Sequence, residues 1–122
     1  MNNKQVIRMN KVNDLINVIA NTDRKFFNFT HRENKLISRF VELKTTVKFL
    51  DGYTLKAVTI NNKNKDCNFS HCGTMWGLVK DFKEWIITGK ESDAKNGYGG
   101  LYCTHWGYSE EGMKAIRRKA TE

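Results

Sequence analysis

Cysteine and histidine are the residues of this 122-residue chain whose types and clustering could bind a metal. Cys67, Cys72, Cys103 and His105 together offer the thiolates and the imidazole that a tetrahedral zinc site requires. Their spacing argues against such a site, because only one residue separates Cys103 from His105, whereas paired zinc ligands usually flank about two to four residues. We therefore expect no cofactor, and a small zinc-stabilised module remains the alternative.

Sequence patterns of known catalytic sites are absent. The chain contains no G-x-S-x-G, G-x(4)-G-K-[ST] or G-x-G-x-x-G segment. Acidic residues such as Glu33 and Glu42 are scattered rather than paired, and a Cys103 nucleophile would need a histidine base and a third, orienting group. We predict that the protein is not an enzyme.

Basic side chains flank three phenylalanines in "RKFFNFTHR", residues 24–32. Cations beside aromatic rings are how single-stranded nucleic acids are neutralised and stacked. The segment also fits a half-buried strand, in which one aromatic face is core and either Phe27 or the face with Phe26 and Phe29 is left for a partner. We predict a stacking platform at Phe27 and phosphate contacts from nearby cations, namely Arg24, Lys25, Arg32, Lys35 and Arg39.

The positive charge of the chain lies in its first half. Residues 1–65 hold 13 lysines and arginines against 5 acids, whereas residues 66–122 hold 8 of each. Such asymmetry favours an anionic partner, here nucleic acid or a nucleoprotein, because clustered cations release counterions from a phosphate backbone. An alternative is that lysine and asparagine reflect AT-rich coding and that the charge covers a solvated face.

Tyrosines and glycines dominate "NGYGGLYCTHWGY", residues 96–108. Glycine permits sharp backbone turns and the aromatics supply large apolar area, which predicts a loop folded back over the core with a structural Trp106. The alternative is a protein-binding surface, because tyrosine often anchors interfaces. Its candidate residues are Tyr98, Tyr102 and Tyr108.

Periodicity predicts a single α+β domain over residues 1–122, with an antiparallel sheet of three to four strands and helices packed on one face. Asp51-Gly52 is expected to turn a tight hairpin, and Gly89 and Ser109 to end and begin helices. The predicted elements are a helix over 11–20 capped by Asn10, strands over 25–30 and 35–43, a hairpin over 45–60, a helix over 74–88 capped by Thr74, and a helix after Ser109.

The first residues, "MNNKQVIRMN", lack the apolar run of a secretory signal, and no apolar run in the chain approaches a bilayer span. An odd number of cysteines agrees with a reducing compartment. We expect a cytoplasmic protein that has no membrane partner.

The segments "FSHCGTMWGLVKDFKEWIITGK" and "NGYGGLYCTHWGYSEEGMKAIRRKA" resemble parts of small tailed-phage and prophage proteins of unassigned activity. The resemblance covers about the last half of the chain. It implies a phage accessory protein, in a class where small binders and inhibitors of host machinery are frequent. A protein-directed inhibitor of a host enzyme or defence system, including the anti-CRISPR type, is therefore the alternative to nucleic-acid binding.

Overall fold

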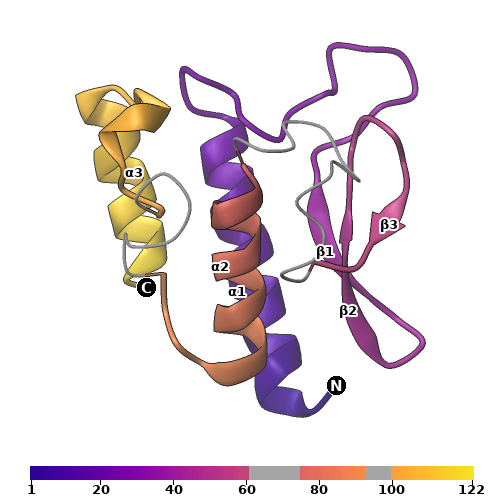
Figure 1. Cartoon of the computed structure of the whole chain (residues 1–122). Coiled ribbons are helices and arrows are strands. Elements are labelled where there is room, and N and C mark those ends of the chain that lie inside the picture. Colours follow the sequence, from indigo (N-terminus) through magenta and orange to yellow (C-terminus); the bar gives the residue numbers. More distant parts are fainter. Residues whose placement is uncertain (61–74, 93–99) are drawn as a thin grey trace.

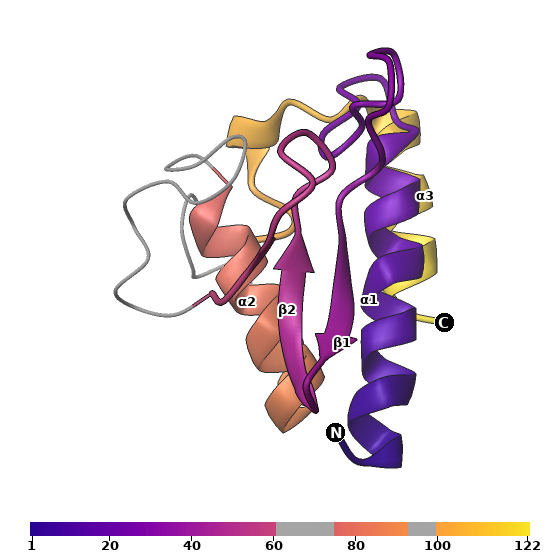
Figure 2. The ribbon, with the colours of Figure 1, turned by 90° about the vertical axis from the view of Figure 1, so that its right-hand side faces the viewer.

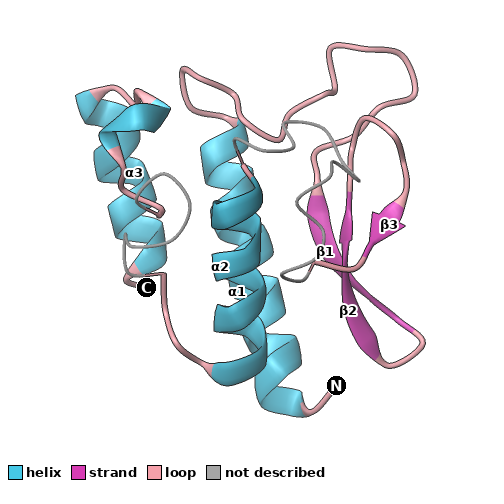
Figure 3. Ribbon diagram, in the orientation of Figure 1, coloured by secondary structure: helices cyan, strands magenta, loops and turns pink. Residues whose placement is uncertain are grey.

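The computed structural model describes residues 1–60, 75–92 and 100–122. Three helices and a three-stranded antiparallel sheet of order β1-β2-β3 make up its regular structure (Figures 1 and 3). The sheet lies on one side of the α1–α2 pair and α3 lies on the other (Figure 1). The predicted α+β fold with helices on one face of an antiparallel sheet is confirmed. Its elements are α1 (Asn3–Ala20), β1 (Arg39–Leu43), β2 (Thr46–Leu50), β3 (Ala57–Val58), α2 (Trp76–Thr88), a 3-10 turn (Thr104–Trp106) and α3 (Glu110–Ala120).

Helix α1 begins much earlier than the predicted residue 11. Asn2 caps it, because its side chain accepts from the Gln5 amide while the Gln5 side chain accepts from the Asn2 amide. The predicted cap at Asn10 is therefore wrong. The early turns are polar because Arg8 donates to the carbonyls of Ile86 at 2.9 Å and Ile87 at 3.1 Å, at the end of α2. Side-chain bonds to a helix terminus carry no apolar periodicity, so the pattern did not reveal them.

Helices α2 and α3 agree with the sequence. The predicted apolar stripe of α2 is buried, and Gly89 ends the helix with a left-handed φ of 83°. The predicted cap Thr74 lies outside the described residues, and the N-cap position is occupied by Met75. Ser109 caps α3 as predicted, since its hydroxyl accepts from the Gly112 amide at 3.0 Å.

The strands differ more from the prediction. Residues 25–30 form no strand and contribute only one isolated bridge, Asn28 to Ile37. Strands β1 and β2 are joined through Lys44 and Thr45, whose φ values of 51° and 65° suit a tight hairpin turn. Strands β2 and β3 pair as predicted, but residues 51–56 connect them, so the two-residue Asp51-Gly52 turn is wrong.

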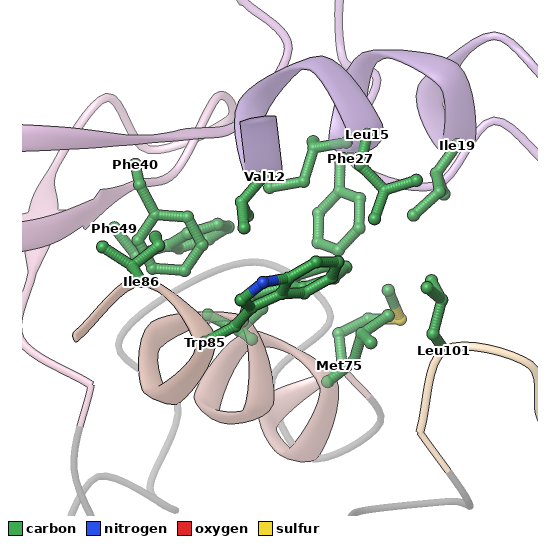
Figure 4. Close-up of a cluster of buried hydrophobic side chains, with 14 of the residues drawn as sticks. Val12, Leu15, Ile19, Phe27, Phe40, Phe49, Met75, Trp85, Ile86 and Leu101 are labelled. Carbon is green, nitrogen blue, oxygen red and sulfur yellow. The ribbon is translucent and has the colours of Figure 1, made fainter. Parts of the chain in front are cut away.

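A cross-strand aromatic pair connects the sheet to the helices. Phe40 of β1 lies opposite Phe49 of β2, with ring centroids 5.2 Å apart, and both side chains are buried. Figure 2 shows β1 and β2 with α2 to their left and α1 to their right, and Figure 4 shows the shared core. Asn13 of α1 fastens the edge strand, because its amide donates to the Phe40 carbonyl at 2.8 Å and its oxygen accepts from the Phe40 N–H at 2.7 Å.

We expect Asn13→Ala to lower the free energy of unfolding by about 2 kcal/mol. The substitution leaves the partly buried N–H and carbonyl groups of Phe40 in β1 without these hydrogen-bond partners. Urea unfolding followed by tryptophan fluorescence measures the change. Asn13→Asp serves as the matched variant, since it can still accept from the Phe40 N–H but cannot donate to the carbonyl. A loss no smaller for Asp than for Ala would contradict the two-bond account.

Candidate nucleic-acid interface

A cleft of about 610 Å³ opens between the α1–β1 connection and the loop between β2 and β3. These two segments meet at the same end of the sheet (Figure 1). No carboxylate occurs among the described residues that line the cleft, and three of its side chains are cations. The lining consists of Arg24, Lys25, Asn28, Phe29, Thr30, His31, Arg32 and Tyr53.

Phe27 is buried in the core and does not line the cleft. Its side chain is 3% exposed, packs edge-on against Phe49 at 6.2 Å, and lies among the core side chains of Figure 4. The predicted stacking platform at Phe27 is therefore wrong. The physical reason is the backbone: Lys25 and Phe27 have φ values of 52° and 69°, which break the in–out alternation of a strand.

Phe29, rather than Phe27, is the phenylalanine at the cleft. It lines the cleft, and its ring lies 5.6 Å from that of Tyr53 at an interplanar angle of 59°. Asn28 fixes the turn beneath it, because its amide donates to the Ala20 carbonyl at 3.0 Å and its oxygen accepts from the Thr30 N–H. The aromatic pair thus joins two loops that are distant in sequence.

Gly52 brings Tyr53 to the cleft. The Leu36 amide donates to the Gly52 carbonyl at 3.0 Å, and the Gly52 amide donates to the Ser38 hydroxyl at 2.9 Å. Asp51 closes the loop from the other side by accepting from the amides of Tyr53 and Thr54. Tyr53 was not among the predicted site residues, because Asp51-Gly52 was expected to form the whole turn. The same dipeptide is the sequence signal for the longer loop that carries Tyr53.

Four of the five predicted phosphate-binding cations gather at this end of the molecule. Arg24, Lys25 and Arg32 line the cleft, and Lys35 adjoins it because its ammonium lies 5.0 Å from the Tyr53 ring. Arg32 lies 5.5 Å from the same ring. In the described part of the chain none of the four forms an ion pair with a carboxylate. Arg24 does interact with the charge of the neighbouring Asp23 carboxylate, without forming such a pair.

Arg39 stands apart from the other four. It is exposed on β1, opposite Leu50, and does not line the cleft. The structure thus does not bring it together with the predicted group.

Arg24 is positioned by the segment before α3. Its guanidinium lies 5.6 Å from the Phe26 ring and against Gly107, where an added Cβ would stand 2.6 Å from Nη1. The neighbouring Asp23 accepts from the Ser109 hydroxyl at 3.0 Å, and this bond holds the pKa of Asp23 below its usual value. The C-terminal third of the chain therefore supports the start of the basic loop.

The zinc alternative falls partly outside the described residues, where Cys67 and Cys72 lie. Cys103 is a half-buried free thiol whose sulfur accepts from the His105 amide at 3.4 Å, and His105 is exposed. No group of three or more potential metal ligands occurs among the residues that the structure describes. Cys103 and His105 are thus neighbours in a turn.

The aromatics of residues 100–108 pack onto the core. Trp106 is 2% exposed and its indole N–H donates to the Gly100 carbonyl at 2.7 Å, which confirms its structural role. Tyr108 contacts Phe26 edge-on, and burial raises the pKa of its hydroxyl. Tyr102 is half-buried under the Arg117 guanidinium, 4.1 Å away. This packing favours a structural role over the predicted partner surface for Tyr102 and Tyr108, and Tyr98 lies outside the described residues.

Comparison with known proteins shows the family of this chain. The family model described as YoqU matches residues 2–122. The chain is 37% identical over 123 residues to the "SPbeta prophage-derived uncharacterized protein YoqU" of Bacillus subtilis (strain 168), covering 99% of this chain and 84% of that protein. No solved structure matches it. In the described part of the chain no helix is long and apolar enough to cross a membrane. The predicted resemblance to small prophage proteins is confirmed, and the chain belongs to the YoqU family.

Proposed function

We propose that this prophage-family protein is a non-enzymatic accessory protein that binds single-stranded nucleic acid, alone or within a nucleoprotein, in the cleft beside Tyr53. One observation carries the proposal: a single cleft combines cations, an aromatic pair and a lining free of carboxylates among its described residues. Phosphates bind Arg24, Lys25, Arg32 and Lys35, and a base packs against Phe29 and Tyr53.

The cations support the phosphate half of the proposal. Arg24 and Arg32 are exposed and already lie beside aromatic rings, so their guanidinium planes are partly ordered before a ligand arrives. A planar guanidinium binds a phosphate through two parallel hydrogen bonds, and pre-ordering lowers the entropy lost on binding.

The aromatic pair favours a single strand over a duplex. Tyr53 is 39% exposed and Phe29 is half-buried, so their rings offer apolar surface at the cleft. In a duplex the base faces are stacked on one another and cannot reach such a platform, whereas unpaired bases can. An unpaired base that stacks on Tyr53 displaces the Lys35 ammonium from the ring toward its flanking phosphates.

Fluorescence anisotropy with labelled 12-nucleotide DNA and RNA strands and their duplexes tests the function. We expect the single strands to bind more tightly than the duplexes at low salt. Four phosphate contacts predict a slope of about −3 in a plot of log affinity against log salt concentration. Absence of binding at low salt, or an affinity that is independent of salt, would reject the proposal.

We expect Tyr53→Leu to weaken single-strand binding by about tenfold, because it removes the ring that stacks a base while it keeps an apolar side chain. The salt dependence stays unchanged, since no cation is lost. Leu43→Ala, at an exposed position on the opposite end of β1, is the matched control and leaves affinity at the wild-type value. Equal affinity of Tyr53→Leu and the wild type would remove stacking from the account.

A further inference from the structure

A second groove, of about 440 Å³, lies at the other end of the sheet, between β2, the end of α2 and the β1–β2 turn. The turn and the end of α2 lie at the bottom of Figure 1, away from the cleft. Its described lining contains two lysines and no carboxylate. The lining residues are Met1, Gln5, Thr45, Thr46, Val47, Lys48, Thr59, Lys83 and Ile87.

The two lysines face the groove from different elements. Lys48 of β2 donates from its ammonium to the Thr59 hydroxyl, and Lys83 of α2 donates to the Ile60 carbonyl. Both bonds are partly buried and both acceptors are neutral. In the described structure each ammonium uses one of its three N–H donors in this way, so that donors remain on both sides of the groove.

The groups around the lysines do not neutralise them. Burial lowers the pKa of Lys83, and the nearby charge of Lys48 lowers it further. The Met1 ammonium also borders the groove, but it is paired with Glu42 at 2.9 Å. Glu84 follows Lys83 in α2 and is not part of the lining. Two like charges held partly out of water and close together are unfavourable unless an anion joins them.

We propose that this groove is a second anion site, which binds a phosphate group between Lys48 and Lys83. The ammonium groups supply charge-assisted hydrogen bonds from two sides, and the groove has room for a small phosphate-bearing molecule. The phosphate belongs either to a free phosphate monoester or to a nucleic-acid backbone. The site does not depend on the cleft beside Tyr53, because the two linings share no residue.

The test is a titration of the isotope-labelled full chain with inorganic phosphate, adenosine monophosphate and an oligonucleotide without terminal phosphate, with chloride at equal ionic strength as reference. We expect saturable shifts of the backbone amide signals of Lys48, Thr59 and Lys83. Lys48→Gln and Lys83→Gln each weaken phosphate binding by about tenfold or more, whereas the exposed Lys56→Gln leaves it unchanged.

The ligands separate the two sources of phosphate. Saturation by phosphate or the monophosphate alone supports a monoester site, and saturation by the oligonucleotide as well supports a backbone site. Shifts no larger than those from chloride, or wild-type affinity in both lysine variants, overturn the proposal. Melting temperatures without ligand establish that the variants fold. A chain with Tyr53→Leu still binds phosphate here, so failure of the cleft and failure of this groove are distinguishable.

Discussion

Gly52→Ala is expected to lower the free energy of unfolding by about 3 kcal/mol, at the upper end of the range for overpacking a close-packed site. A Cβ at this position would stand 2.1 Å from the Leu36 carbonyl oxygen and 2.9 Å from the Ser38 nitrogen. Both are backbone atoms, so no side chain can turn away to make room. The cost comes from lack of space, because Gly52 does not have a positive φ.

The same substitution also disturbs the cleft, because the contact of Gly52 with residues 36–38 holds Tyr53 beside Phe29. Urea unfolding monitored by tryptophan fluorescence gives the stability, and anisotropy gives the affinity. Tyr53→Leu is the neighbouring control: it weakens binding but changes stability by less than about 0.5 kcal/mol, as is usual for exposed positions. A Gly52→Ala protein as stable as the wild type would contradict the close packing of the two loops.

Removing three cations of the cleft region together is expected to weaken single-strand binding by about 100-fold at low salt. The variant is Arg24→Gln, Arg32→Gln and Lys35→Gln. The slope of log affinity against log salt becomes shallower by about 2, because each lost phosphate contact of a single strand contributes about 0.7. Stability changes little, since these side chains form no ion pair within the described structure.

A triple variant of equal charge separates a local site from overall charge. Lys4→Gln, Lys90→Gln and Arg118→Gln remove three exposed cations that do not line the cleft. With both triple variants compared at about 0.15 M salt, we expect affinity within about threefold of the wild type, because exposed charges more than about 8 Å from the bound strand are largely screened there. Equal losses in both triple variants would show that net charge, and not the cleft, attracts nucleic acid.

The sequence predicted those elements whose stability rests on a periodic apolar face. Helix α2 buries its predicted stripe and α3 begins at its predicted Ser109 cap. Both signals are local, because a helix repeats every 3.6 residues and a cap acts within one turn. The first turns of α1 were missed because Arg8 and Gln5 bond to distant carbonyls of α2.

The sequence predicted most cations of the candidate site but not the arrangement of its aromatic side chains. Residues 25–30 were predicted to form a strand with Phe26 and Phe29 on one side, although strict strand alternation separates these two rings. Positive φ values at Lys25 and Phe27 instead turn Phe27 into the core and leave Phe29 at the cleft. Such φ values are rare outside glycine and follow from tertiary contacts that no short segment encodes. Tyr53 reaches the site through the packing of Gly52 on Leu36, which is also long-range.

Photo-crosslinking tests most directly whether single-stranded nucleic acid binds in this cleft. A 12-nucleotide strand carrying 5-iodouracil is irradiated with the full chain, and tryptic peptides are identified by mass spectrometry. The account predicts cross-links in peptides 26–32 and 49–56, which contain Phe29 and Tyr53, and their loss when unlabelled strand is added in excess. Cross-links confined to peptides of α3, or peptides 26–32 and 49–56 left unmodified by a strand that binds, would contradict it.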